Sequence, residues 1–196
     1  FENVITSSGN DIIAGDSGNN VLDGGAGIDT LVLSGAVAGY SVSDTGGVVT
    51  IVDSTPGRDG TDTAVNVEVF QFTDGTAVFD GVNFTPIAID DTNTTDNNTI
   101  LVIAAADLLA NDIDLDVGEE KTVTSIDSTA TLGSGTDNGD GTFSYEPGTA
   151  FDSLTEGTSE TDSFTYTVSD GIANANATVT ITVTFGVNTS LIVGDT

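Results

Sequence analysis

Residues 6–32 read TSSGNDIIA, GDSGNNVLD and GGAGIDTLV when the chain is cut every nine residues, and this stretch decides the fold. In each copy the fourth residue is glycine, the eighth is apolar, and the sixth is Asp11, Asn20 or Asp29. Glycine supplies the positive φ that a tight turn needs, and the apolar residue suits a short strand that faces inward. A Gly-Gly-x-Gly-x-Asp-x-apolar-x repeat is typical of a parallel β-roll that binds calcium in its turns.

The nine-residue spacing pairs Asp11 with Asp29. Two nonapeptides make one coil, so turns eighteen residues apart stack on the same edge of the roll. Stacked strands lie ~4.8 Å apart and Ca²⁺ takes oxygen ligands at ~2.3–2.6 Å, so one ion fits between two turns. We therefore predict a calcium site at Asp11 and Asp29, completed by carbonyls from turns that contain Gly9, Gly25 and Gly27. A flexible loop rich in Gly, Asp and Asn is the alternative.

The second edge of the roll is less regular. Asn20 stands where aspartate is expected, and residues 33–38 (LSGAVA), eighteen residues later, offer no clean partner. We expect this edge to bind calcium weakly or not at all. GRDGTDTAV, residues 57–65, resumes the pattern but is out of phase with the third repeat. It is either a second calcium turn that uses Asp59 and Asp62 or a plain hairpin turn.

The charge of the chain restricts its partners. Thirty-one acidic residues against two basic ones, Arg58 and Lys121, give a formal net charge of −29. Such a chain repels itself and cannot offer a basic face to phosphate, so nucleic acid is excluded as a partner. The simplest interpretation is that the folded chain needs bound divalent cations to neutralise its acidic residues. The alternative is a solvated acidic surface of the halophilic kind.

The residue types exclude most enzyme classes. The chain has neither His nor Cys, which removes the Ser/His/Asp and Cys/His arrangements, zinc sites of His or thiolate, and disulfides. A carboxylate pair could hydrolyse glycosides in principle, but the aromatic residues follow strand patterns and suit core packing. We predict that the chain is not an enzyme, and a carbohydrate-binding module stays open. No run approaches the ~18 apolar residues of a membrane span.

Strand patterns with Gly, Asp and Pro turns fill the rest of the chain. At Thr85-Pro86 the composition changes, and seven or so longer strands then occupy about a hundred residues, the size of an immunoglobulin-type sandwich. We predict an all-β protein: a β-roll with a capping β-module over residues 1–85, an antiparallel sandwich over 86–185, and a linker or pairing strand over 186–196. Residues 106–112 are the only helix-like segment.

Two families are recognisable in these motifs. Residues 6–32, with GIDTLVLSGAVAGYSVSD (27–44) and GRDGTDTAVNVEVFQFTDGTAV (57–78), resemble the hemolysin-type RTX calcium-binding repeats and their capping module. The stretches AIDDTNTT, DLLANDIDLD and ETDSFTYTVSDGIANANATVTITV, between residues 88 and 183, are similar to bacterial cadherin-like (VCBS-type) sandwich repeats.

The cadherin-like resemblance implies calcium near one end of the sandwich, between successive modules. The candidate ligands are Asp90, Asp91, Asp112, Asp114, Asp116 and Asp170. Acidic residues at i, i+2 and i+4 can point three carboxylates at one ion, as in the first half of an EF-hand loop. The rest of that loop is missing, since Val117 stands where its glycine should be. A solvated acidic turn is the alternative.

The RTX resemblance implies type I secretion and an extracellular or cell-surface location. The acidic chain would stay loose in the low-calcium cytosol and fold outside, because the free energy of ion binding becomes folding free energy. We predict a calcium-dependent structural or adhesive module of a bacterial RTX protein. Its expected partners are calcium, neighbouring modules or copies of itself, and a cell-surface or carbohydrate receptor.

Two alternatives remain for this function. One is a subunit of a calcium-stabilised filament or surface layer, assembled head-to-tail through the strand-like residues 190–196. The other is the non-catalytic calcium-binding tail of a secreted hydrolase.

Overall fold

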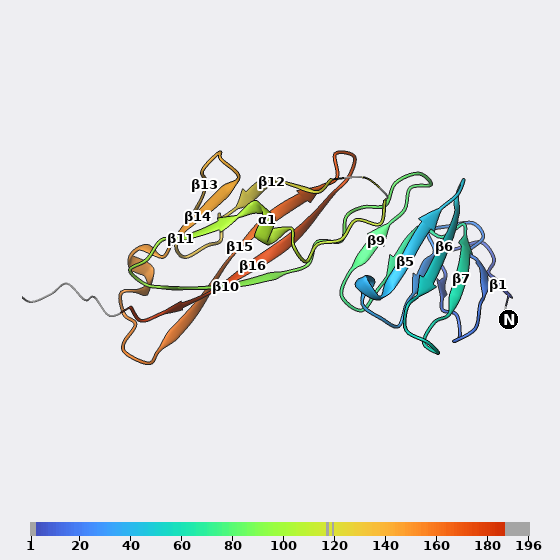
Figure 1. The fold of residues 1–196 in the computed structure, drawn as a ribbon, viewed down its shortest axis with the longest axis horizontal. Coiled ribbons are helices and arrows are strands. Elements are labelled where there is room, and N and C mark those ends of the chain that lie inside the picture. The colour runs from blue at the N-terminus through green and yellow to red at the C-terminus, as the bar shows by residue number, and fades with distance from the viewer. Residues whose placement is uncertain (1–2, 117, 119, 187–196) are drawn as a thin grey trace, which may run out of the picture. The chain divides into compact units, whose positions relative to one another are not determined.

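The computed structural model describes residues 3–116, 118 and 120–186. Strands make up nearly all of its regular structure (Figure 1), which confirms the predicted all-β class. The predicted strand over residues 190–193 and the linker after Gly186 lie outside the described residues. The predicted helix-like segment 106–112 overlaps α1 (Ala105–Leu108), a single turn.

The N-terminal part is a roll whose strands alternate between two parallel layers. The register joins Val4 to Leu22 in one layer and Ile13 to Leu31 in the other, so each coil takes eighteen residues as the repeat predicts. The apolar residue of each repeat is buried inside the roll. One layer holds β1 (Asn3–Ile5), β3 (Val21–Asp23) and β7 (Thr61–Val65), and the other holds β2 (Ile12–Ile13), β4 (Thr30–Val32) and β8 (Val69–Gln71).

Residues 57–71 form a third coil of this roll. β7 pairs in parallel with β3, which sets Ala64 beside Leu22, and β8 pairs in parallel with β4, which sets Phe70 beside Leu31. The interpretation that GRDGTDTAV is out of phase with the roll is therefore wrong. The segment between the second and third coils is extruded as a hairpin, so the phase returns in space although it is lost in sequence.

The hairpin and one further strand cap the two layers. The hairpin strands extend the β1-β3-β7 layer in antiparallel order, and β9 pairs antiparallel with β8. Their inward residues join the core of the roll, where the Phe79 ring stacks on Phe84. The elements are η1 (Val37–Gly39), β5 (Tyr40–Asp44), β6 (Val48–Asp53) and β9 (Thr76–Val78).

The C-terminal strands form two further sheets. Along β16 (Asn174–Thr184) every second residue from Ala177 to Val183 is buried. Tyr145 and Tyr166 are among the fully buried side chains, as two facing sheets require. One sheet has the order β10 (Asp91–Asp96), β16 (Asn174–Thr184), β15 (Ser159–Ser169), β12 (Thr122–Asp127). The other has the order β11 (Leu101–Ala104), β14 (Thr142–Glu146), β13 (Ser134–Asp137), and η2 (Gly148–Phe151) follows β14.

The chain divides into two compact units. The first comprises the residues up to Ile89 together with 111–122 and 168–175, and the second comprises 90–110, 123–167 and the residues from Asn176 onward. Four of the six acidic candidates from the cadherin-like stretch thus belong to the same unit as the roll: Asp112, Asp114, Asp116 and Asp170.

Candidate metal centre

Asp11 and Asp29 lie on stacked turns, as their spacing predicts. Asp29 Oδ1 accepts the backbone N–H of Asp11 at 2.8 Å, which locks the two turns in register. Asp29 is 0% exposed, and one further oxygen of each carboxylate, Asp11 Oδ2 and Asp29 Oδ2, is buried without a hydrogen-bond partner. A buried carboxylate oxygen without a donor is strongly destabilising. A bound cation removes that penalty, so this pair fits calcium.

The predicted glycines allow the turns to stack closely. Gly9, Gly25 and Gly27 have φ values of 137°, 81° and 148°, a region that favours glycine. A Cβ on Gly27 would overlap the carbonyl oxygen of Gly9, and one on Gly25 would overlap that of Ser7. Side chains are therefore excluded at these two positions, and the backbone carbonyls of one turn lie against the next turn.

The opposite edge pairs Asn20 with Asp62. Asp62 Oδ1 accepts hydrogen bonds from the backbone N–H and from Nδ2 of Asn20, both at 2.9 Å. Burial raises the pKa of Asp62, and the hydrogen bonds from Asn20 oppose that rise. The expectation that the Asn20 turn has no stacked partner is therefore wrong, because strand pairing brings in a residue 42 positions away. On this edge the side-chain amide of Asn20 donates to the buried carboxylate of Asp62, in the place where a cation would otherwise be needed.

Asp59 has a different environment from Asp62. Its Oδ2 accepts the backbone N–H of Ser34 at 2.7 Å and the hydroxyl of Tyr40. Burial, then the hydrogen bond to Asp59, raises the pKa of Tyr40 above its usual range. The guanidinium of Arg58 covers the Tyr40 ring at 4.6 Å. These bonds hold Asp59 to the start of the capping hairpin.

A second acidic cluster gathers Asp114, Asp116 and Asp170 around Asn83. Asp116 Oδ2 accepts the N–H of Phe84 at 2.7 Å, and Asp170 Oδ2 accepts Asn83 Nδ2 at 3.2 Å. Asp114 Oδ1 accepts the N–H of Asp116 at 2.9 Å. Asp114 Oδ2 and Asn83 Oδ1 are buried without a hydrogen-bond partner. Two orphaned oxygens among three carboxylates suit a hard cation such as calcium.

The pKa shifts of these three carboxylates also favour a cation at the cluster. Burial raises the pKa of Asp114, and the charge of Asp170 adds to that rise. Burial also raises the pKa of Asp116, to which Asp114 and Asp170 contribute as like charges. Burial also acts to raise the pKa of Asp170. The hydrogen bonds from the N–H groups of Ala173 and Ile172 outweigh this effect, so the pKa of Asp170 is lowered. A cation at this cluster would offset the mutual repulsion.

Sequence reasoning missed Asn83. No acidic motif surrounds it, and its distance from Asp170 in sequence hides the contact. The other predicted ligands each accept a hydrogen bond: Asp112 Oδ1 from the N–H of Ile89 (2.7 Å), Asp90 Oδ1 from the N–H of Thr178 (2.7 Å), and Asp91 Oδ2 from the hydroxyl of Tyr166 (2.8 Å).

Carboxylates alone complete neither site. Among the described residues, no group of three or more acidic side chains has the arrangement of a finished metal centre. Calcium takes six to eight oxygens and accepts backbone carbonyls, side-chain amides and water among them. Both candidate sites offer such oxygens beside their carboxylates.

Two known family profiles match the chain, one over the cadherin-like part and one over the nonapeptide repeats. The profile of the bacterial cadherin-like domain matches residues 83–185, which is more than half of the chain. The chain belongs to the bacterial cadherin-like domain family. The profile of the RTX calcium-binding nonapeptide repeat matches residues 2–31. The predicted order, RTX repeats followed by a cadherin-like domain, is thereby confirmed.

Solved structures resemble the chain only weakly. The extracellular lipase LipA from Serratia marcescens shares 17% identity over 48% of this chain and 21% of its own, with a TM-score of 0.28. The endo-fucoidan hydrolase MfFcnA4 of glycoside hydrolase family 107 shares 15% identity over 71% of this chain and 18% of its own, with a TM-score of 0.34. The chain thus spans about a fifth of these proteins, and such scores carry no argument. No curated protein matches it.

The two families define the chain at a coarse level. It is a calcium-binding extracellular module built from domain types that are not catalytic. Within the ranges that the structure describes, no helix is both long and apolar enough to cross a bilayer.

Proposed function

We propose that the chain is a calcium-dependent structural and adhesive module of a secreted or surface-displayed bacterial protein, and that it folds and stiffens when it binds calcium outside the cell. The observation that carries this proposal is the pair of buried, unpartnered oxygens, Asp11 Oδ2 and Asp29 Oδ2, on stacked turns. Without a cation these oxygens oppose folding of the roll, and with calcium they become ligands.

The acidic composition makes folding responsive to calcium. The net charge of −29 favours expanded states when calcium is scarce. Binding to the folded roll alone couples ion concentration to stability. Calcium at a hundred times its Kd stabilises by about 2.7 kcal/mol per site. This suits export through a type I system as a loose chain, followed by folding in millimolar calcium.

The cluster around Asn83 is the second proposed calcium site. Its ligands would be Asp114, Asp116 and Asp170 with Asn83 Oδ1. The backbone bridge between Ile87 and Ile113, with N–H to O distances of 2.7 and 3.0 Å, lies in the same segments. An ion here would fix residues 83–89 against 111–116.

A titration of the chelator-stripped chain with calcium, followed by circular dichroism and calorimetry, tests the proposal. We expect strand signal to rise and the melting temperature to increase with calcium, and magnesium to act weakly because it demands octahedral geometry and keeps its waters. Asp29→Asn should abolish much of this response. Glu156→Gln, an equal charge change at an exposed residue away from both sites, should not. Identical melting curves in chelator and in millimolar calcium would refute the proposal.

The adhesive role needs a separate measurement. We expect the calcium-loaded chain to bind bacterial or host cell surfaces, or immobilised glycans, and to be released by chelator. Binding that is equal in chelator would count against a calcium-dependent adhesive role.

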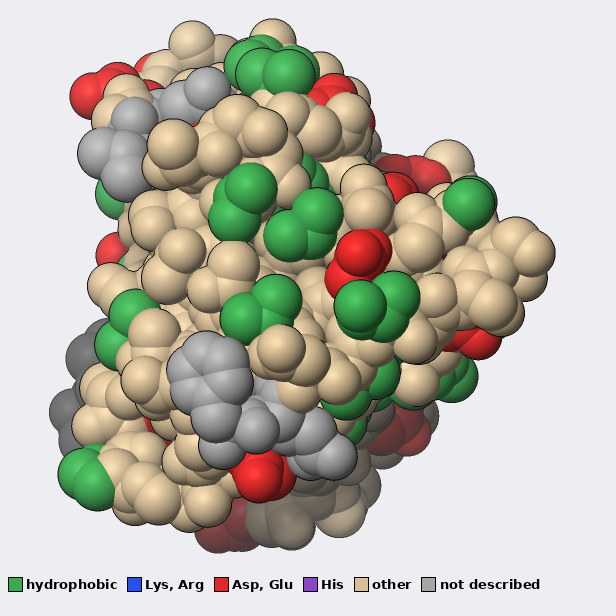
Figure 2. All heavy atoms as spheres, turned by 90° about the vertical axis from the view of Figure 1, so that its right-hand side faces the viewer, with side chains coloured by type: hydrophobic (Ala, Val, Ile, Leu, Met, Phe, Trp, Pro, Cys, Tyr) green, Lys and Arg blue, Asp and Glu red, His purple; other side chains and the backbone are tan. Residues whose placement is uncertain are grey.

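Assembly head-to-tail is the second candidate function, and the first coil favours it. β1 and β2 are edge strands of their sheets among the described residues, and exposed edges invite further strands. Ile5 and Ile12 on this coil are 75% and 79% exposed. Figure 2, which looks from the side where β1 lies in Figure 1, shows hydrophobic side chains on the surface. Light scattering with calcium tests it: Ile12→Ser should reduce any self-association, and a monomer at all concentrations would exclude it.

A further inference from the structure

The turn between β7 and β8 is shorter than the turn that it stacks on. In the second coil six residues separate Asp23 from Thr30, whereas in the third coil only Asn66–Glu68 separate Val65 from Val69. The register sets Asn66 over Gly24 and Glu68 over Asp29. The glycine-rich middle of the turn has no counterpart in the third coil.

Glu68 takes the place of the repeat aspartate in this coil. Glu68 Oε2 accepts the backbone N–H of Asp29 at 2.9 Å, just as Asp29 Oδ1 accepts that of Asp11 at 2.8 Å. The carboxylate therefore recurs on the same edge in three successive coils. Glutamate is one methylene longer than aspartate, and this length lets the carboxylate reach the edge from a shorter turn.

The unpartnered oxygen of Asp29 faces this third coil. A Cβ built on Gly24 would lie 2.7 Å from Asp29 Oδ2 and would overlap the carbonyl oxygen of Asn66. Both oxygens therefore border the space that glycine leaves empty, close enough together to share one cation. Asn66 is the one described non-glycine residue with positive φ, at 52°, a conformation that asparagine tolerates. Its Nδ2 donates to Asp23 Oδ1 at 2.8 Å, which anchors the turn.

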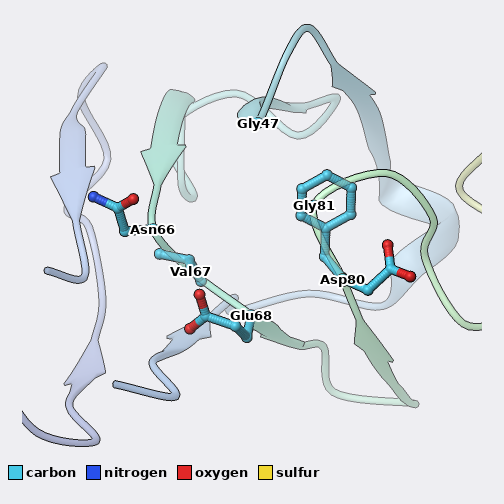
Figure 3. Close-up of a pocket in the computed structure, with 7 residues that line it drawn as sticks. Gly47, Asn66, Val67, Glu68, Asp80 and Gly81 are labelled. Carbon is cyan, nitrogen blue, oxygen red and sulfur yellow. The ribbon is translucent and has the colours of Figure 1, made fainter. Parts of the chain in front are cut away.

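An open pocket lies beside Glu68, between the short turn and Gly47, Phe79, Asp80 and Gly81 of the capping module. It has a volume of about 230 Å³, enough for several waters. In Figure 3 Asn66, Val67 and Glu68 lie along one segment of its wall, and Asp80 and Gly81 belong to a separate segment. Asn66 and Glu68 line this pocket and Asp29 does not, so a cation held at Asp29 and Glu68 would take its water ligands from the Asn66 and Glu68 side.

We infer that Asp29 Oδ2, the Glu68 carboxylate and the Asn66 carbonyl form a further divalent-cation site, which lies beyond the nonapeptide stretch and opens to solvent. It shares Asp29 with the calcium site of the proposed function but holds a separate ion. Because its outer ligands are water, it binds calcium more weakly and exchanges it faster than the closed Asp11–Asp29 site. It makes the third coil, from the capping module, part of the calcium-dependent roll.

Calcium stoichiometry of the full chain tests this assignment. Isothermal titration and equilibrium dialysis are run on the wild type, Glu68→Gln, Asp11→Asn, Asp29→Asn and the control Glu156→Gln. Glu68→Gln keeps the acceptor for the Asp29 N–H, so its circular dichroism in chelator should match the wild type. Of the two ions of the roll, we expect Glu68→Gln to lose the weaker one and keep the tighter one, Asp11→Asn to lose the tighter one, and Asp29→Asn to lose both, while the ion of the Asn83 cluster stays in every variant.

The outcomes separate this inference from the proposed function. Full stoichiometry in Glu68→Gln overturns the inference and leaves the proposed function standing. A wild type that binds no calcium overturns the proposed function as well. Glu68→Asp keeps the charge but shortens the side chain, and we expect it to weaken calcium binding at the Asp29–Glu68 site at least 10-fold. Unchanged affinity in that variant overturns the role of the longer glutamate.

Water access provides an independent readout. Mn²⁺ in an open site keeps exchanging water, so it should enhance solvent proton relaxation in the wild type and in Asp11→Asn. Glu68→Gln should lose that enhancement. Equal enhancement in Glu68→Gln and the wild type would contradict the open site.

Discussion

Asp62 lies against Asn20 across two coils of the roll, although 42 residues separate them in sequence. Asp62 Oδ1 accepts both the backbone N–H and the side-chain Nδ2 of Asn20, each at 2.9 Å. On the other edge, Asp29 Oδ2 has no such donor. The two edges of one roll therefore neutralise their buried carboxylates by different means, an amide on one and, as we propose, calcium on the other.

Asn20→Asp should convert the amide edge into a calcium-dependent one. In chelator, two buried carboxylates would face each other with the backbone N–H of residue 20 as donor but without the side-chain donor or a cation, which costs about 3 kcal/mol and lowers the melting temperature by roughly 6–12 °C. Millimolar calcium should restore the melting temperature and add one bound ion to the titration. A variant that melts as the wild type does in chelator would show that the amide does not have this role.

Calcium removal should affect the roll before the sandwich. The roll contains buried carboxylate oxygens without donors, whereas the sheets of the second unit bury Tyr145, Tyr166 and Ile181 in a core of their own. Hydrogen exchange read by mass spectrometry should therefore show β3 and β4 losing protection in chelator, while β15 and β16 retain it. Equal loss in both parts would mean that the chain unfolds as one cooperative unit.

Gly27→Ala should destabilise the roll more than Gly9→Ala. Both glycines have positive φ, so alanine is strained at either position, typically by about 1–3 kcal/mol. Only at Gly27 would the new Cβ overlap a carbonyl oxygen of the neighbouring turn, whereas the space at Gly9 is open. Overlap with backbone adds about 1–3 kcal/mol. Thermal melting with calcium measures the difference, and equal melting temperatures would contradict the close stacking of the turns.

The buried pair Tyr145 and Asp162 should make the second unit sensitive to acid. Asp162 Oδ2 accepts the Tyr145 hydroxyl at 2.7 Å and the N–H of Gly133 at 2.9 Å. Burial raises the pKa of Asp162, but its backbone donors, chiefly Gly133 and Leu132, and Tyr145 outweigh that effect and lower it. A lowered pKa in the folded state stabilises the protein above the unfolded value of about 3.9, and this contribution disappears as the pH falls through the folded pKa.

Tyr145→Phe isolates this contribution. It removes one donor to Asp162 and should cost about 1.5–3 kcal/mol at pH 7, with a smaller loss at pH 2, where a larger fraction of the carboxyl is protonated. Denaturant unfolding at the two pH values measures the difference. A loss that is the same at both would indicate a packing effect in place of the charged hydrogen bond.

The sequence anticipated the features that depend on short, regular spacing. The nine-residue period places Asp11 over Asp29 because each coil consumes eighteen residues, and the register of β2 with β4 agrees. The change of composition at Thr85-Pro86 likewise anticipated a second strand pattern, and the acidic alternation brought out Asp114 and Asp116. These features depend on residues close together in the sequence, so they can be recognised from the spacing of those residues alone.

The positions of Asn20 against Asp62, of Glu68 against Asp29 and of Asn83 against Asp170 were decided by the tertiary structure. A hairpin between the second and third coils changes the eighteen-residue offset to 42 on one edge, and a shortened turn makes it 39 on the other. The burial of Leu22 beside Ala64 and of Leu31 beside Phe70 restores the register. The free energy of burying apolar side chains depends little on the length of the loop that connects them. The sequence spacing therefore does not reveal these pairings, which form only when the core does.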